Sequence, residues 1–306
     1  MTEEIFEFCS SPGITLRGIL TIPENITGTP LLLLPAGLKY RVGPGRLYVC
    51  LARWFAERGH PVLRFDPQGM GESDGLLESG RTLELWNTIE NGRFVADGMQ
   101  AGDALLERFA TTKFYIAGLC GGAISAQLVA ELVPEKIAGV ISFNTAATLS
   151  TMKTVGTIEA RQNLREYTKK LNSPESWKRI LGGDSSYETV WASLIGGVRG
   201  LAGSSDFEAD RKQLGLNPLF TKSIRSLLKH GVSQLFLFSE NDSRWPQFQE
   251  LVLAHELNGL MEGPSHVIKV IPNANHELHL PQCREAAFDE ISAWLTNNSS
   301  AATSLL

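Results

Sequence analysis

The chain has 306 residues, of which 43% are apolar and 20% are charged, a balance typical of a soluble globular protein with a large core. Its net charge is −5 and it has no long basic run, so nucleic acid is not an expected partner. The apolar runs are too short to span a bilayer, and the acidic segment after Met1 does not resemble a signal peptide.

Along the chain, short apolar runs alternate with segments of helical spacing. The all-leucine run at 31–34 indicates a central strand that is covered on both faces. Strands are predicted at 6–9, 14–22, 31–34, 61–65, 114–117, 137–143, 235–238 and 267–271. Helices are predicted at 46–58, 92–109, 123–130 and 284–295. This alternation predicts βαβ units and a parallel sheet.

The alternation stops between about 148 and 229, where no strand pattern is found and helical patterns occur at 160–171 and 175–181. We interpret this region as a helical cap inserted between two strands. The predicted fold class is therefore α/β, with a mostly parallel eight-stranded sheet flanked by helices. The predicted parts are a core over 1–147 and 231–297, a cap over 148–230 and a flexible tail over 298–306.

A tight turn after the strand at 114–117 carries a cysteine. The segment Gly118-Leu119-Cys120-Gly121-Gly122 has the pattern of a nucleophile elbow, G-x-S-x-G, with cysteine in the place of serine. Glycines on both sides permit a strained turn that would present Cys120 to a substrate. The alternative is a buried cysteine in a glycine-rich turn, since free cysteine is often a small core residue. The pentapeptide alone leaves both readings open.

Three candidate catalytic groups follow strand ends in the order nucleophile, acid, histidine: Cys120, Asp242 and His276. Active sites of open α/β sheets lie at the carboxyl ends of the strands, and this order is the one expected of α/β hydrolases. A thiolate nucleophile needs a base, and the base needs an orienting group. We assign Cys120 as nucleophile, His276 as base and then acid, and Asp242 as the orienting acid. Glu240 competes with Asp242, and His279 with His276.

A tetrahedral intermediate needs two N–H donors aimed at its oxyanion. Gly121 follows the nucleophile at a helix N-terminus and is the first predicted donor. The second is expected from the glycine-rich loop after residue 34, where Leu38 is our choice and Gly37 the alternative. Gly37 and Arg41 are also predicted to contact the substrate, Arg41 through an anionic group. A solvated arginine is the other reading of Arg41.

These residues together resemble the α/β-hydrolase superfamily. The stretch Asp66-Pro67-Gln68-Gly69-Met70-Gly71-Glu72-Ser73 is similar to the D-x-x-G-x-G-x-S segment of that superfamily. A closer resemblance is to the exosortase A system-associated hydrolases, which carry a cysteine at the elbow. The motifs of that likeness are Lys39-Tyr40-Arg41-Val42-Gly43, Arg64-Phe65-Asp66 and Gly118-Leu119-Cys120. The chain departs from that group at Gly121 and Gly122. Its cysteine elbow also resembles those of dienelactone hydrolases and of cyclases that take acyl chains from carrier proteins.

The favoured function is acyl transfer, by hydrolysis or transfer of a thioester or activated ester through an acyl-cysteine at Cys120. A thiolate leaves more readily than an alkoxide, so an acyl-cysteine passes its acyl group on easily. A carbon–carbon bond-forming cyclase or an eliminating enzyme would use the same triad. A non-catalytic small-molecule binding protein on the same fold is the third hypothesis. The expected partner is a small acyl substrate, free or bound to a carrier protein.

The four cysteines are scattered without CxxC or metal-ligand spacing. This pattern favours free thiols in a reducing compartment, so we expect a cytoplasmic protein. Neither a metal-ligand pattern nor a phosphate-binding loop is present, so we expect no metal and no organic cofactor.

Overall fold

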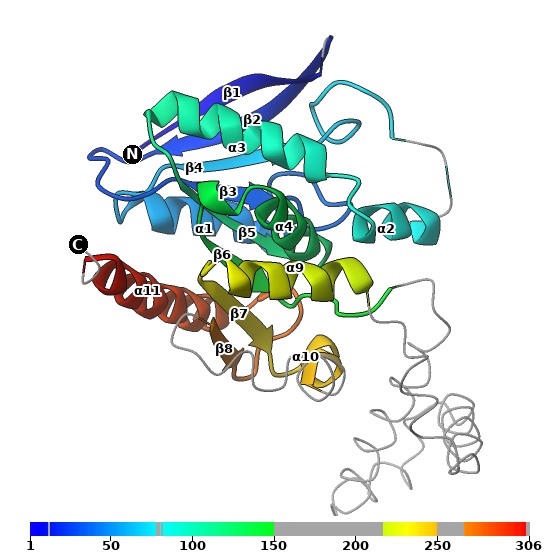
Figure 1. Ribbon diagram of the computed structural model, residues 1–306, viewed down its shortest axis with the longest axis vertical. Helices are drawn as coiled ribbons and strands as arrows, with labels where there is room; N and C mark the ends of the chain where they lie inside the picture. The colour runs from blue at the N-terminus through cyan, green and yellow to red at the C-terminus, as the bar shows by residue number, and fades with distance from the viewer. Residues whose placement is uncertain (12, 78–79, 81, 150–216, 250–265, 304–306) are drawn as a thin grey trace, which may run out of the picture. The chain divides into compact units, whose positions relative to one another are not determined.

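A computed structural model describes the chain except for residues 12, 78–79, 81, 150–216, 250–265 and 304–306 (Figure 1). The chain divides into two compact units, one made of Met1–Leu149 with Asn217–Leu306 and the other of Ser150–Leu216. The second unit lies outside the described residues, as do the helices predicted at 160–171 and 175–181. All features below belong to the first unit.

An eight-stranded sheet forms the centre of this unit, in the order β1-β2-β4-β3-β5-β6-β7-β8. β2 is antiparallel to β1 and to β4, and the other neighbouring strands are parallel. The strands are β1 (Thr2–Ser11), β2 (Ile14–Ile22), β3 (Leu31–Leu34), β4 (Val62–Asp66), β5 (Phe114–Leu119), β6 (Ile137–Phe143), β7 (Gln234–Ser239) and β8 (His266–Ile271). The predicted mostly parallel eight-stranded sheet is confirmed.

Helices cover both faces of the sheet (Figure 1). The helices are α1 (Leu47–Ala56), α2 (Thr82–Glu90), α3 (Val95–Phe109), α4 (Gly121–Leu132), α9 (Pro218–Lys229), α10 (Arg244–Phe248) and α11 (Pro281–Thr303). α1 and α11 share one apolar core with the sheet, and α3, α4 and α9 pack on the opposite face. In the described part of the chain, no helix combines the length and the apolar character needed to cross a membrane.

The leucine run of β3 shows why a central strand is apolar throughout. Leu31 and Leu33 point into the core under α1 and α11, whereas Leu32 and Leu34 point into the core under α3 and α4. Successive side chains of a strand face opposite sides of the sheet, so a strand covered on both faces is apolar at nearly every position.

Three helices of the structure have no counterpart in the sequence prediction, and one other differs in extent. α2, α9 and α10 were not predicted as helices. α9 lies within the range that we placed in the cap, and it packs on α4 in the first unit. α11 continues to Thr303, past the position where we expected the tail to begin. α2 packs on α4, the helix that begins directly after Cys120.

Candidate active site

Cys120 lies at the apex of a sharp turn between β5 and α4. Its backbone φ of 56° and ψ of −116° are unusual for a residue with a side chain. The Cys120 amide donates to the carbonyl of Phe143 at the end of β6, at 2.9 Å, which ties the turn to the neighbouring strand. Gly118 is required because a β-carbon there would collide with the backbone of Gly122. The local geometry is that of a nucleophile elbow.

The ring of His276, in the loop after β8, makes contacts with both other members of the predicted triad. Its Nδ1 lies 2.6 Å from Oδ2 of Asp242, which follows β7. Burial lowers the pKa of the ring, but hydrogen bonds with Asp242 and with Cys120, together with the charges of these two groups, raise it to about 10. A negative charge on either partner stabilises the imidazolium form of the ring.

The two competing residues point elsewhere. Glu240 is exposed, and its Oε2 accepts a hydrogen bond from the amide of Asn273 at 2.8 Å. The half-exposed ring of His279 lies 3.3 Å from the side-chain nitrogen of Asn275 and 3.4 Å from the carboxylate of Glu277. The structure thus brings together the acid and the histidine that we assigned.

The loop after β3 lies directly against the elbow. A β-carbon at Gly121 would lie 3.3 Å from the Cα of Gly37. As the first residue of α4, Gly121 has an N–H without an acceptor inside the helix. Within the described residues, no hydrogen bond uses the amide of Leu38 as a donor. Both predicted oxyanion donors therefore remain available, on neighbouring segments.

Trp86 of α2 covers these two glycines. A β-carbon at Gly121 would lie 3.0 Å from Cζ3 of the Trp86 ring, and one at Gly37 would overlap the ring. The indole thus occupies space that a side chain at position 121 would otherwise use. We did not predict this role for Trp86. Its spacing of three residues from the buried Ile89 is the sequence signal that could have indicated a helix there.

Arg41 is engaged by a buried carboxylate. Its guanidinium pairs with Oδ2 of Asp66, and its amide donates to Oδ1 of the same side chain at 2.7 Å. The Asp66 side chain is fully buried, and that of Arg41 is 20% exposed. Glu72 also donates its amide to Asp66, at 3.2 Å. These contacts hold the loop after β3 against the loop after β4.

Asn144 follows β6 and connects three segments. Its Oδ1 accepts from the amide of Ser239 at 2.7 Å, and its Nδ2 donates to the Ser239 hydroxyl at 2.9 Å. The same Nδ2 donates to the carbonyl of His276 at 2.8 Å. Asn144 therefore fixes the backbone that carries the histidine. The position of Asn144 after a buried strand, as for Cys120, was the available signal, but its lack of a carboxylate led us to give it no role.

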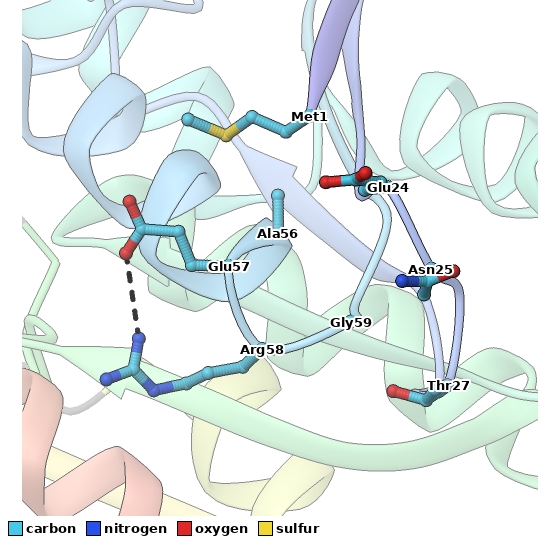
Figure 2. A pocket seen from close by; sticks show the side chains of 8 residues that line it. All are labelled: Met1, Glu24, Asn25, Thr27, Ala56, Glu57, Arg58 and Gly59. Carbon is cyan, nitrogen blue, oxygen red and sulfur yellow. Dashed lines mark ion pairs between the residues drawn. The ribbon is translucent and has the colours of Figure 1, made fainter.

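A separate hollow of about 520 Å³ opens at the other end of the sheet, near the start of β4 (Figure 2). It is lined by Met1, Glu24, Asn25, Thr27, Ala56, Glu57, Arg58 and Gly59. Ligands of open α/β sheets bind at the carboxyl ends of the strands, where Cys120 and His276 lie, so this hollow does not belong to the candidate site. Among the described residues, no group of three or more histidine, cysteine or acidic side chains could hold a metal ion.

Comparison with known proteins finds solved structures that share the fold of the chain. No protein-family model matches the chain. The polyketide transferase grgF of a Penicillium species is 36% identical over 69 residues, a match that spans 22% of this chain and 22% of that protein. The crystal structure of the α/β hydrolase GrgF from Penicillium has a TM-score of 0.53 at 18% identity and covers 98% of this chain and 99% of that one.

Two further solved structures match over nearly the whole chain. The dienelactone hydrolase of Anabaena variabilis has a TM-score of 0.55 at 16% identity, covering 97% of this chain and 98% of that one. DcsB, solved in complex with its substrate analogue, has a TM-score of 0.58 at 13% identity, covering 97% of this chain and 99% of that one. The sheet order, the elbow and these likenesses define the α/β-hydrolase fold.

Proposed function

We propose that the protein is an acyl-transfer enzyme that works through an acyl-cysteine at Cys120. The observation that supports this proposal is the 2.6 Å contact between Nδ1 of the His276 ring and Oδ2 of Asp242, on a ring whose pKa is also raised by Cys120. An imidazolium between two negative groups is the arrangement that keeps a cysteine ready to attack as its thiolate. The likeness to exosortase A system-associated hydrolases stays a prediction.

The reaction follows from the roles of these groups. The Cys120 thiolate attacks the carbonyl carbon of the substrate, and the amides of Gly121 and Leu38 donate to the oxyanion that forms. The carbon–oxygen or carbon–sulfur bond to the leaving group then breaks, and His276 gives its proton to that group. An acceptor attacks the Cys120 thioester while the neutral ring takes the acceptor's proton. Asp242 holds the ring in place through both steps.

The substrate class that fits this chemistry is an acyl thioester. Transfer from one thioester to another is nearly balanced in free energy, whereas transfer from an alkyl ester or an amide to a thiol is uphill. The match to a polyketide transferase over about a fifth of both chains supports a polyketide chain as the acyl group. The acyl chain can arrive free or bound to a carrier protein.

Carbon–carbon bond formation is the second candidate function, and the same local match favours it. A polyketide chain carries acidic carbon atoms between its carbonyl groups. A carbanion at such a carbon can attack the acyl-cysteine within the same molecule and release Cys120 with formation of a ring. Hydrolysis, transfer and ring closure therefore differ in the group that attacks the Cys120 thioester.

The first experiment is intact-mass analysis of the protein after mixing with p-nitrophenyl acetate. We expect a burst of p-nitrophenol and one acetyl group on Cys120. The adduct should be absent in Cys120→Ala and should clear slowly in His276→Ala, since that variant lacks the base for deacylation. Cys9→Ala is the matched control, because Cys9 is an exposed free cysteine on β1.

An acetyl adduct that persists in Cys120→Ala, or no adduct on the wild-type protein together with tight binding of an acyl ligand, would overturn the proposal in favour of a binding protein. Product analysis with a carrier-bound β-ketoacyl thioester then separates the three outcomes of the acyl-enzyme. A free acid indicates hydrolysis, an ester or a new thioester indicates transfer, and a ring indicates cyclisation.

A further inference from the structure

Tyr48 of α1 reaches the ends of two central strands just before the catalytic loops begin. Its side chain is fully buried. Its hydroxyl donates to the carbonyl of Leu34, the last residue of β3, at 2.7 Å. The same hydroxyl accepts a hydrogen bond from the amide of Leu119, the last residue of β5, at 2.8 Å. One side chain thus joins the two strand ends.

This bridge stands where the parallel ladder of β3 and β5 ends. The last paired residues are Leu34 and Gly118. Beyond them β3 continues into the loop of Leu38, and β5 continues into the elbow of Cys120. A hydroxyl can donate and accept at once, so it satisfies one backbone group of each strand where the direct pairing stops. A phenylalanine ring would leave both groups buried without partners.

We propose that Tyr48 is a positioning residue for the oxyanion hole of the acyl-transfer reaction, and this inference rests on the proposed function. The bridged carbonyl lies four residues before Leu38, and the bridged amide lies two residues before Gly121. By fixing the separation of the two strand ends, the hydroxyl fixes the separation of the two N–H donors. Oxyanion stabilisation depends on donors held at hydrogen-bond distance from the oxygen, so small displacements reduce the rate.

The electrostatic surroundings keep this bridge intact when the nucleophile is charged. Burial raises the pKa of the Tyr48 hydroxyl far above its ordinary value, the hydrogen bond from Leu119 lowers it, and the charge of Cys120 raises it further. The hydroxyl therefore keeps its proton beside a Cys120 thiolate, and it needs that proton to donate to Leu34. The two hydrogen bonds of the Tyr48 hydroxyl can therefore persist when Cys120 is a thiolate.

The test compares two reactions of the same cysteine in Tyr48→Phe. Acetylation by p-nitrophenyl acetate passes through an oxyanion, whereas alkylation by iodoacetamide is a direct displacement at carbon without one. We expect the acetylation rate constant to fall about tenfold while the alkylation rate constant stays within about twofold of wild type. A merely structural role would lower both rates together or neither. Tyr115→Phe is the matched control, since Tyr115 is a buried tyrosine of the same core.

A second variant covers the case in which Tyr48→Phe does not fold. Gly43 packs on the Tyr48 ring, and a β-carbon there would lie 2.9 Å from its Cγ, so Gly43→Ala displaces the ring without removing the hydroxyl. The same selective loss of acetylation is expected. Equal acetylation in the wild type and in the folded variants, or equal losses of both reactions, would overturn the role of Tyr48 and leave the proposed function intact. A wild-type protein that is alkylated but never acetylated would overturn both.

Discussion

At the scale of single residues, Cys120 occupies a backbone conformation that its own side chain disfavours. The positive φ of Cys120 is a region that glycine enters freely, whereas a residue with a β-carbon does so at a cost of about 1–2 kcal/mol. In the proposed reaction, this cost falls on the residue whose sulfur would meet the substrate. The effect of the backbone strain on stability can therefore be measured in variants that lack the Cys120 thiol.

We expect Cys120→Gly to be more stable than Cys120→Ala by about 1 kcal/mol, because glycine removes the strain that alanine keeps. Urea unfolding of both variants measures the difference. Cys283 is the matched control, since it is a buried cysteine in α11, where glycine costs about 0.5–1 kcal/mol relative to alanine. The order of the two variants should therefore reverse between the two positions, and the same order at both would contradict a strained elbow.

The raised pKa of His276 makes stability depend on pH. The folded protein holds the ring proton up to a pKa of about 10, whereas the unfolded chain releases it near the ordinary value of 6.5. Between these values the folded state binds more protons, so the free energy of unfolding decreases as the pH rises. The stabilisation is fully present below about 6.5 and is lost as the pH rises through about 10.

The measurement is the difference in unfolding free energy between wild type and His276→Gln at pH values of about 6, 8 and 10. This difference should shrink towards the alkaline end. His279→Gln is the control, because its half-exposed ring touches neither Cys120 nor Asp242 in the structure. A difference that stays constant across the range, or that grows with pH, would show that the charged ring does not stabilise the fold.

At the scale of secondary-structure elements, α2 is the helix that shapes the surroundings of the elbow. Its Trp86 ring lies against Gly37 and Gly121, beside the expected position of the oxyanion. If the proposed acyl group lies beside the elbow, Trp86→Ala removes a ring from its surroundings. We therefore expect this variant to raise the ratio of the rate with longer acyl chains to the rate with acetyl, on the order of tenfold. The measurement is kcat/KM for a series of p-nitrophenyl esters of increasing chain length.

Trp54 provides the comparison for this helix. It lies on α1, where its ring packs on Phe288 of α11, away from the elbow. Trp54→Ala should lower stability without changing the order of preference among the esters. If Trp86→Ala keeps the wild-type order as well, α2 does not contribute to the choice of acyl group.

The elements that were predicted well are those whose pattern has one physical explanation. The apolar run of β3 and the mostly apolar run of β6 are short and rich in leucine, isoleucine or valine, which is typical of strands covered on both faces, and both were placed correctly. α2 is a short helix with a weaker apolar pattern, so its formation depends on packing against α4, which the sequence does not display. α9 has a clear amphipathic pattern, but a pattern does not say which surface its apolar side meets.

At the scale of the whole molecule, the candidate site is assembled from strand ends far apart in the chain. Chain order indicated that the segments around Cys120, Asp242 and His276 would meet, because parallel strands place their carboxyl ends at one edge. Chain order alone does not show whether Asp242 or Glu240 contacts the histidine, since both residues follow β7 closely. That choice depends on a tertiary contact, the hydrogen bond from Asn273 to Glu240, which no local pattern reveals.

Asn144 connects these distant segments, because its side chain binds Ser239 after β7 and the carbonyl of His276. We expect Asn144→Ala to lower the free energy of unfolding by about 2–4 kcal/mol, since buried backbone groups lose their partners. Acetylation of Cys120 should fall as well, because the loop that carries His276 loses its anchor. Asn91→Ala is the control, as Asn91 is exposed and its side chain bonds to Asn87 one turn earlier, so its change should stay below about 0.5 kcal/mol. Equal unfolding midpoints for the two variants in urea would mean that other contacts hold the loop after β8. The contact with Asp242 would then be the one that positions the His276 ring.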